Sequence, residues 1–438
     1  MTLRELALGM LDQYELEGKY VNLLLTSHSA DSLKREERAS LTALLYTVTE
    51  RKHTYDYYIS SVAKRQIAEM DIHTLNILRL GVCQIVAMDS IPDFAAVNET
   101  VKLARGKGER AFVNAILRKI AGLKAEGALP MPDKNKNYAR YLSVKHSFPL
   151  WLTKHFIALV GEENTERIFE HFNTHTSTDL TVNTAKVTRD ELVASLRADG
   201  IDATASELSP ITVRINGSVD PRSLRGFDEG HFFVQDTASA LDALVLAPNA
   251  GDSIIDVCAC PGGKSFAAAI LAGKDAEISS FDIHESKLSL ITSGAKRLGL
   301  DNIGVGVMDA TKPDPALFSR FDRVICDCPC SGLGVLGKKP DMRYRSEDGI
   351  KELPELQYEI LNASKNYLKV GGYLVYSTCT LNPKENEDVV RRFLHNNPDF
   401  TSVEFEIGEL KSSGGMLTLW PHIHATDGFF IAKIKRIK

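Results

Sequence analysis

Apolar residues recur every three or four positions through the first 122 residues of the chain, and no alternating stretch interrupts them. This period is that of amphipathic helices, so the segment predicts a small all-helical domain. A polar stretch with two prolines, "EGALPMPDKNKN" at 126–137, follows it and is typical of a domain boundary. We therefore expect an all-helical domain over residues 1–128.

Helical and alternating periods both occur in residues 138–230. Helical segments rich in aromatic residues come first, and "LTVNTAK" and "ITVRI" then predict two strands on either side of a helix that ends at Gly200. The pattern indicates a small α+β subdomain that links the helical domain to the rest of the chain. We expect Trp151, Phe156 and Phe172 to be buried in a core rather than stacked on nucleic acid bases.

From residue 231 onward, short apolar strands alternate with helices. The predicted strands are "SIIDV", "EISSFDI", "IGVGVMDA", "FDRVICD" and "GGYLVYSTC", with helices such as "GKSFAAAILAG" and "ESKLSLITSGAKRLG" between them. This alternation predicts a parallel, doubly wound α/β sheet. Two final segments, "MLTLWPH" and "GFFIAKIKRIK", predict an antiparallel pair, and we expect the whole α/β domain to span 231–438.

Composition narrows the class of protein. The chain has 438 residues, of which 44 % are hydrophobic and 25 % are charged, as expected for a globular protein of two or three domains. No apolar run approaches the roughly 18 residues that a membrane-spanning helix needs. Six of the seven cysteines lie after residue 257, which disfavours a secreted disulfide framework and favours a reducing, cytoplasmic setting.

Charge is distributed unevenly along the chain. The net charge is −5, yet residues 1–150 carry 21 Lys and Arg against 17 Asp and Glu. Within 102–119, Glu109 is the one acid among six basic residues: Lys102, Arg105, Lys107, Arg110, Arg118 and Lys119. Charge alone favours a solvated helical face here, and the alternative is a patch that contacts phosphates.

The turn "DVCACPGGKS" at 256–265 joins a predicted strand to an alanine-rich helix and allows three interpretations. A phosphate-binding P-loop needs a glycine five positions before Gly263, where Cys258 stands instead. A zinc site would use Cys258 and Cys260 with three later cysteines, but their C-x-C spacing and the absence of nearby histidines disfavour it. We therefore expect this turn to bind neither a nucleoside triphosphate nor a metal ion.

The third interpretation is an adenosine cofactor without a pyrophosphate, which fits S-adenosylmethionine. The Pro-Gly-Gly turn lets the backbone approach a ligand closely. Predicted strands end in acids at the carboxyl edge, where open α/β sheets bind ligands. These acids are Asp256, Asp282, Asp309 and Asp327. The second of them is well placed to accept hydrogen bonds from ribose hydroxyls.

Two cysteines indicate the chemistry. Cys330 in "CDCPCSGLG" and Cys379 in "YSTCTLNPKENE" each follow a strand end, so we expect both at one cleft. Carbon 5 of a pyrimidine is a poor nucleophile until a thiolate adds to C6 and makes it enamine-like. Asp327 is placed to hold the N3 and N4 edge of a cytosine. These residues alone do not order the roles of the two cysteines.

Together these motifs resemble those of the NOL/NOP/Sun family of RNA 5-methylcytosine methyltransferases, and in particular its bacterial small-subunit rRNA methyltransferase B (Sun/Fmu) branch. "DVCACPGGKS" is similar to the family's cofactor turn and "CDCPCSG" to its D-A-P-C-S-G motif, with Cys260 and Cys328 in place of alanines. "STCTLNPKENE" and "FVQDTASAL" resemble two further family segments, and "ERAFVNAILRKI" resembles part of a NusB-like RNA-binding domain.

The resemblance implies a Rossmann-like S-adenosylmethionine-dependent fold that methylates C5 of a cytosine in small-subunit (16S) rRNA. It assigns Cys379 as the nucleophile and Cys330 to resolution of the adduct. It also implies a set of cofactor contacts: Cys258, Ala259, Cys260, Pro261, Gly262, Gly263, Lys264, Asp282, Asp309 and Asp327.

The same resemblance supplies a partner, rRNA before full assembly of the small subunit, and so favours RNA contact by the basic run at 102–119. "KKPDMRYR" at 338–345 follows the Cys330 turn, and we expect it to contact the substrate backbone. We expect Lys384 and Glu385 to begin the helix after the Cys379 turn. The absence of a heptad pattern favours a monomer. A tRNA target and a non-catalytic RNA-binding or antitermination factor stay open as alternatives.

Overall fold

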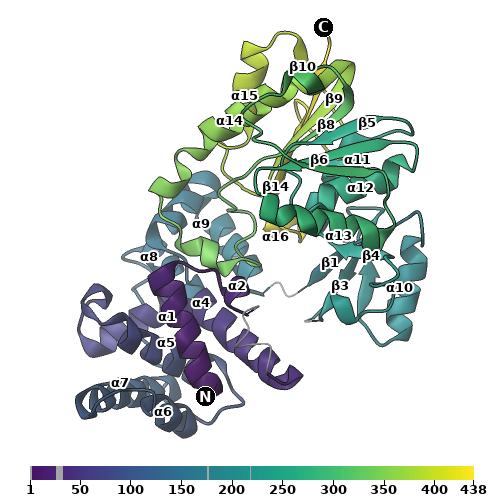
Figure 1. Ribbon diagram of the computed structural model, residues 1–438. Coiled ribbons are helices and arrows are strands. Elements are labelled where there is room, and N and C mark those ends of the chain that lie inside the picture. Colours follow the sequence, from purple (N-terminus) through teal and green to yellow (C-terminus); the bar gives the residue numbers. More distant parts are fainter. Residues whose placement is uncertain (1, 26–32, 175–176, 218) are drawn as a thin grey trace. The chain divides into compact units, whose positions relative to one another are not determined.

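The computed structural model describes residues 2–25, 33–174, 177–217 and 219–438 (Figure 1). The chain forms two compact units. The first, called here the helical unit, comprises residues 1–173 and 338–345, and the second, called the sheet unit, comprises residues 174–337 and 346–438. No helix within the described ranges has the length and apolar character to cross a membrane.

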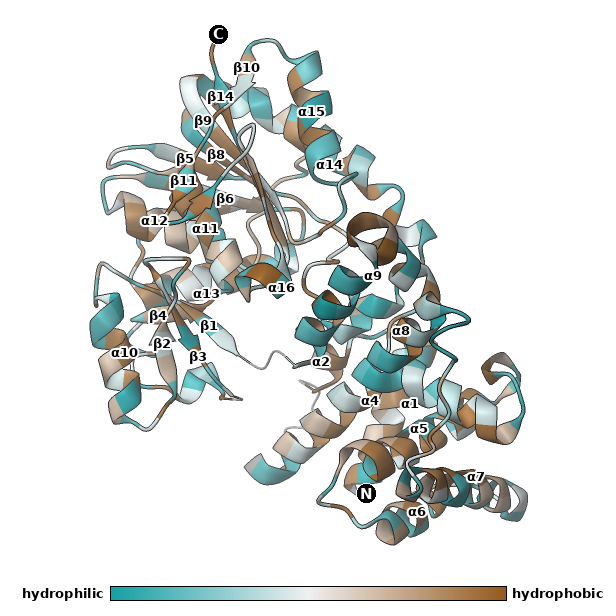
Figure 2. Ribbon diagram, turned by 180° about the vertical axis from the view of Figure 1, so that it is seen from behind, coloured by the Kyte–Doolittle hydropathy of each residue, from teal (hydrophilic) through white to brown (hydrophobic). Residues whose placement is uncertain are grey.

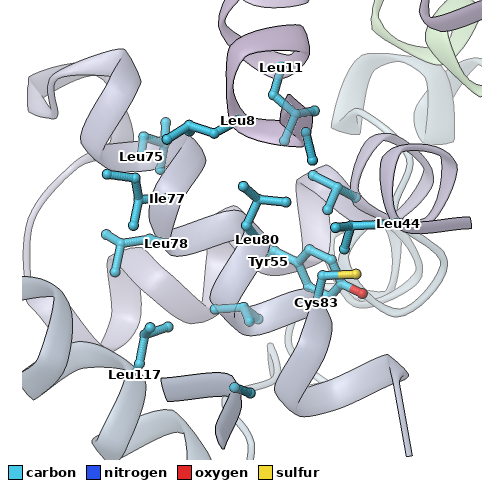
Figure 3. Close-up of a cluster of buried hydrophobic side chains, with 14 of the residues drawn as sticks. Leu8, Leu11, Leu44, Tyr55, Leu75, Ile77, Leu78, Leu80, Cys83 and Leu117 are labelled. Atoms are coloured by element: carbon cyan, nitrogen blue, oxygen red, sulfur yellow. The ribbon is translucent and has the colours of Figure 1, made fainter. Parts of the chain in front are cut away.

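The described part of the helical unit is built from helices, as predicted for residues 1–122. They are α1 (Leu3–Glu17), α2 (Val21–Leu25), α4 (Arg35–Ala63), α5 (Ile72–Ala87), α6 (Asp93–Val101), α7 (Lys107–Ala125), α8 (Tyr138–His146) and α9 (Leu150–Thr174). α5 is apolar on most of its surface and lies at the centre, where Leu78 and Leu80 are fully buried (Figure 3). α1, α4, α6 and α7 pack around it.

α8 and α9 belong to the helical unit, although the polar stretch at 126–137 predicts a boundary before them. A hydrogen bond joins α4 to the end of α8: Thr54 Oγ1 donates to the Val144 carbonyl at 2.6 Å. Phe148 stacks on Phe169 with ring centroids 3.9 Å apart. Phe156 and Phe172 are buried in the same aromatic core, as predicted. Trp151 is half-buried.

The segment 338–345 packs inside the helical unit, since the Arg343 side chain is fully buried there. Its guanidinium carbon lies 4.2 Å from the centroid of Phe148, and Nη1 donates to the Glu50 carbonyl at 3.2 Å. The expectation that this segment contacts substrate is therefore wrong for Arg343, because its guanidinium is buried against the Phe148 ring and is not exposed to solvent.

The sheet unit begins with a small antiparallel sheet in the order β2-β3-β1-β4. Its elements are β1 (Thr178–Val182), α10 (Arg189–Ala198), β2 (Ala203–Ala205), β3 (Thr212–Ile215) and β4 (Phe232–Val234). β1, α10 and β3 were predicted. β2 and β4 have three residues each, too few to show an alternating period.

The large sheet has the order β10-β14-β9-β8-β5-β6-β7, with β13 also paired to β14. Its strands are β5 (Ser253–Asp256), β6 (Glu277–Asp282), β7 (Ile303–Val307), β8 (Phe321–Asp327), β9 (Leu368–Thr378), β10 (Phe400–Ser402), β13 (Met416–Leu419) and β14 (Phe429–Arg436). β5 to β9 are parallel, and β14 runs antiparallel to β9 and β13. Both the parallel core and the terminal antiparallel pair were predicted.

Helices cover both faces of the large sheet. They are α11 (Thr237–Leu246), α12 (Gly263–Ala272), α13 (Leu288–Leu298), α14 (Leu353–Ser364) and α15 (Glu387–Asn396), and short elements α16 (Pro421–His424), β11 (Glu406–Ile407) and β12 (Leu410–Lys411) follow. Ile254 packs in one core with α11 and α12, while Ile255 packs in another with α14 and α15. Figure 2 shows the sheet strands mostly in the brown of hydrophobic residues. The doubly wound α/β class is thus confirmed.

Candidate active site

The carboxyl edge of the large sheet gathers the predicted acids. β5, β6 and β8 end in Asp256, Asp282 and Asp327, and Asp309 follows β7 by two residues. β5 lies between β6 and β8, so the strand order reverses direction at this point. Open α/β sheets bind ligands at such a reversal, outside the carboxyl ends of the strands.

The turn after β5 is held against two strand ends. The Cys258 amide donates to Asp256 Oδ1 at 3.3 Å, and the Cys260 amide donates to Asp282 Oδ2 at 3.3 Å. Gly262 adopts φ +113°, and a Cβ on it would lie 2.3 Å from the Phe266 ring. Only glycine fits there. The turn from Cys258 to Gly263 therefore presents bare backbone beside Asp282.

Asp282 and Asp309 are both partly exposed at this edge. Asp282 accepts the His284 amide at 2.9 Å through Oδ1. Asp309 accepts the hydroxyl of Thr311 at 2.7 Å, and the Lys312 ammonium lies 2.9 Å away. These hydrogen bonds from Thr311 and Lys312 lower the pKa of Asp309 to about 2. Asp309 is therefore a fixed negative charge.

Lys264 points into the interior toward the end of β8. Its Nζ lies 2.6 Å from Asp327 Oδ2 and 3.1 Å from Ser239 Oγ. Burial opposes its charge, but the carboxyl groups of Asp327, Asp242 and Asp256 raise its pKa above the ordinary value. Lys264 therefore stays an ammonium and fixes one oxygen of Asp327.

The two predicted cysteines lie together. β8 and β9 are neighbouring parallel strands, so the turns that follow them meet at the same edge. The sulfur atoms of Cys330 and Cys379 are 3.1 Å apart. The hydrogen bond with Cys379, together with burial, raises the pKa of Cys330 well above that of an ordinary thiol. Cys330 therefore keeps its proton at neutral pH.

Glu385 joins both cysteine turns and was missed as a site residue. Fully buried, it accepts the Ser331 amide at 2.8 Å and the Asn382 side-chain amide at 2.9 Å. Gln357 donates to the same carboxylate at 2.9 Å. The expectation that Lys384 and Glu385 begin a helix is wrong, because α15 begins at Glu387 and the Glu385 side chain turns inward to these donors.

Asp242 on α11 and Ser377 on β9 were also missed. Both are fully buried, and the Ser377 hydroxyl contacts Asp242 Oδ2 and lies 3.0 Å from Asp327 Oδ1. Burial raises the pKa of Asp242 to about 7, although Lys264 opposes the shift. A single acid inside the apolar helix "TASALDALVL" was the available signal.

The six predicted RNA-contacting residues lie on the helical unit, in α7 and just before it. All six side chains are exposed: Lys102, Arg105, Lys107, Arg110, Arg118 and Lys119. Lys102 is paired with Glu99 at 2.6 Å, while Arg110 and Arg118 donate to neighbouring oxygens of the same segment. Their exposure fits contact with a polyanion.

Within the described residues, one group of side chains has its possible ligand atoms close enough together to hold a metal ion. Ligand atoms of His146, Glu166 and Glu170 lie within 4.8 Å of one another. The Lys145 ammonium, however, lies 2.6 Å from Glu166. A cation is thus already supplied by the chain, and the group carries no argument for a metal ion.

Family models match three parts of the chain. Residues 1–122 match the NusB family, 148–221 the ferredoxin-like domain of RsmF/B-like methyltransferases, and 243–435 the 16S rRNA methyltransferase RsmB/F family. These matches agree with the predicted order of regions along the chain: an all-helical region, then an α+β region, then a Rossmann-like region. The exact limits 1–128, 138–230 and 231–438 stay predictions.

Curated relatives match the chain over nearly its full length. A probable ribosomal RNA small subunit methyltransferase B from Bacillus subtilis is 34 % identical and one from Synechocystis is 35 % identical, each with 99 % of both chains covered. The ribosomal RNA small subunit methyltransferase B of Klebsiella pneumoniae is 31 % identical over 99 % of this chain and 98 % of its own.

Solved structures agree with the fold. The crystal structure of PH0851 aligns with a TM-score of 0.79 and 26 % identity, covering 100 % of this chain and 99 % of its own. A methyltransferase homolog protein from Pyrococcus horikoshii aligns with a TM-score of 0.59 and 28 % identity, covering 67 % and 97 %. NSun6 from the same organism, solved with SFG, supports the fold alone at 24 % identity, with a TM-score of 0.61 over 67 % of this chain and 99 % of its own.

Proposed function

The chain belongs to the RsmB/F family of 16S rRNA methyltransferases, and from this premise we propose that it methylates C5 of a cytosine in that RNA through a covalent cysteine adduct. The observation that carries the proposal is the 3.1 Å separation of the Cys330 and Cys379 sulfur atoms beside Asp327. Methylation of an amino group needs no cysteine nucleophile, whereas an unactivated C5 does.

The methyl donor is S-adenosylmethionine, which supplies an electrophilic methyl group. The residues at the carboxyl edge fit it. A Cβ on Gly262 would strike Phe266, so the turn from Cys258 to Gly263 can offer its backbone to an adenosine. Asp282, partly exposed at the end of β6, would accept hydrogen bonds from ribose hydroxyls. Asp309 would contribute a nearby negative charge.

Cys379 acts as the nucleophile. Its sulfur forms a bond to C6 of the cytosine, and the displaced electron pair makes C5 nucleophilic. After C5 has been methylated, a base removes the C5 proton, the C–H electron pair re-forms the C5–C6 double bond, and Cys379 leaves C6 as a thiolate. The resemblance of the two cysteine turns to those of the family supports this order of roles. Cys330 instead assists resolution of the adduct.

Asp327 holds the N3 and N4 edge of the cytosine and stabilises the adduct as charge develops on the ring. The 2.6 Å contact with Lys264 supports this role, since it fixes the direction of the carboxylate before substrate arrives. Lys264 thus acts through Asp327 as well as belonging to the cofactor turn. The buried Glu385 holds the two cysteine turns in register.

RNA is held by the exposed basic residues at 102–119 of the helical unit. Phosphate contacts of this kind orient the RNA without reading its sequence. We place the enzyme in the cytoplasm, as a monomer that acts on rRNA before the small subunit is complete.

Two cysteine variants test the mechanism. Cys330→Ala is expected to accumulate a covalent RNA–protein adduct, because the adduct forms and is not resolved. Cys379→Ala is expected to form none. Denaturing gel electrophoresis with labelled rRNA distinguishes the two, and the opposite pattern would reverse the roles. Cys260→Ala and Cys328→Ala are matched controls beside the same site, and both should turn over without accumulating the adduct.

The target is tested separately. Bisulfite sequencing of rRNA from a deletion strain should show one lost 5-methylcytosine, and unchanged rRNA would contradict the proposed substrate. A tritiated S-adenosylmethionine assay separates the enzyme from a non-catalytic RNA-binding factor, which would bind RNA and transfer nothing. If tRNA rather than rRNA is labelled, the chemistry stands and the substrate is wrong.

A further inference from the structure

A line of polar side chains leads from the interior of α11 to the cytosine-holding carboxylate. Asp242, fully buried, contacts the Ser377 hydroxyl through Oδ2. The same hydroxyl lies 3.0 Å from Asp327 Oδ1. The other oxygen of Asp327 lies 2.6 Å from Lys264 Nζ. Neither Asp242 nor Ser377 has a direct role in the proposed chemistry, yet the hydrogen bonds of Ser377 connect Asp242 to Asp327.

If Asp242 and Asp327 are both ionised, there are too few hydrogens to make both contacts of Ser377 into hydrogen bonds. A serine hydroxyl carries one hydrogen, and Ser377 contacts two carboxyl oxygens. With two carboxylates, one of these contacts would set oxygen lone pairs against each other. With a proton on Asp242, the acid donates to Ser377 Oγ and the serine hydrogen is left for Asp327. One added proton satisfies both contacts.

The second oxygen of Asp242 supports the same assignment. Oδ1 is buried and has no hydrogen-bond partner among the described residues. An ionised carboxylate with one bare buried oxygen is strongly unfavourable, whereas a carboxylic acid tolerates it far better. The charged groups around Asp242 are Lys264 from α12, Asp327 from β8 and Asp256 from β5. One ammonium thus faces three carboxyl groups, a balance that favours protonation of a buried acid.

We propose that Asp242 is a positioning residue that carries a proton, donates it to the Ser377 hydroxyl, and so directs the Ser377 hydrogen to Asp327. The inference deepens the proposed function, on which it rests for the role of Asp327. Ionisation of Asp242 turns the serine hydrogen toward α11 and removes a donor from Asp327. Methyl transfer is therefore sensitive to the proton on a side chain that never contacts the substrate.

The first test is a pH profile of kcat at saturating RNA and S-adenosylmethionine. The wild-type rate should fall as the pH rises past about 7, where Asp242 loses its proton. Asp242→Asn keeps a neutral donor that cannot ionise, so kcat should drop about threefold at mildly acidic pH and show no alkaline fall. Ser377→Ala should lower kcat more, about tenfold, with an unchanged KM for the methyl donor.

Asp256 provides the matched control. Burial also raises its pKa to about 7, but its hydroxyl partner is Ser265, which bonds to Ser280 rather than to Asp327. Asp256→Asn should keep the alkaline fall, whatever its effect on the maximal rate. An alkaline fall that disappears in Asp256→Asn and persists in Asp242→Asn would overturn the proposal.

A second measurement does not depend on activity or on the identity of the RNA. Difference infrared spectroscopy of the free protein at neutral pH should show the carbonyl band of a protonated carboxylic acid. Asp242→Asn should remove the part of this band that comes from Asp242 and leave the part that comes from Asp256, and Ser377→Ala should shift the Asp242 part because the acid loses its acceptor. A band that neither substitution affects places the proton elsewhere and contradicts the inference. If the band responds as expected while Cys379→Ala still methylates RNA, the adduct mechanism is wrong and the proton on Asp242 stands.

Discussion

Two buried cations, one in each unit, have opposite surroundings. Lys264 in the sheet unit faces three carboxyl groups, which raise its pKa. Arg343 in the helical unit lies over Phe148 with Glu50 as its acid at 3.6 Å, and burial lowers its pKa to about 10. A surplus of carboxyl groups around one cation is costly and marks a site built for chemistry, whereas a cation matched to one acid and an aromatic ring marks an anchor.

Replacing Lys264 tests the chemical half of this comparison and should have the largest effect. Lys264→Met leaves Asp327 without its fixed counter-charge, so we expect kcat to fall about 100- to 1,000-fold. Tritiated methyl transfer to rRNA measures it. Lys312→Met is the control, because Lys312 is an exposed partner of Asp309, and it should change kcat less than about threefold.

Replacing Arg343 tests the structural half. Arg343→Met removes the cation between Phe148 and Glu50, and we expect the free energy of unfolding of the helical unit to fall by about 3 kcal/mol. Urea unfolding of the full chain, followed by circular dichroism, measures this loss. The kcat of the folded fraction should change little. A large loss of kcat with unchanged stability would make Arg343 part of the chemistry and end the distinction.

The surplus acids of the sheet unit should also make stability depend on pH. Asp242 and Asp256 have folded pKa values of about 7 against an ordinary value of 3.8, so the folded protein binds more protons than the unfolded chain between these limits. Stability therefore falls as pH rises through this window and levels off above it, by up to about 1.4 kcal/mol per pH unit for each acid. Asp242→Asn should flatten the slope in urea unfolding, and a slope identical to wild type would contradict the assignment.

The smallest effects are expected on the exposed basic surface of the helical unit. Lys107→Gln and Arg118→Gln should each weaken RNA binding a few-fold and reduce the salt dependence of log K by about 0.9 for each lost phosphate contact. Filter binding over a range of salt concentrations measures both. Lys136→Gln, an exposed lysine of the same unit outside 102–119, is the control. Equal slopes for all three variants would remove this surface from the RNA interface.

The sequence predicted what depends on local periodicity. The helices of 1–122, the parallel strands and the terminal antiparallel pair follow from apolar spacing, and the strand-end position of Cys330 and Cys379 brought them to one edge. The missed residues depend on contacts between distant parts of the chain. Asp242 meets Ser377 across α11 and β9, and Arg343 looked exposed in "KKPDMRYR" because its partner Phe148 lies far away in sequence. Glu385 was misassigned since a lone glutamate in a polar turn is usually solvated.

The return of residues 338–345 to the helical unit has a consequence for synthesis. The chain passes between the two units three times, after Asn173, Gly337 and Arg345. As the ribosome makes the protein from its N-terminus, the helices emerge first but lack the side chain that covers Phe148 until Arg343 has been added. The earliest-made unit is thus completed late, after strands β5 to β8 of the sheet unit already exist. A single cleavage of the chain therefore cannot release the complete helical unit, and a truncation after Asn173 leaves Phe148 without the Arg343 side chain that covers it.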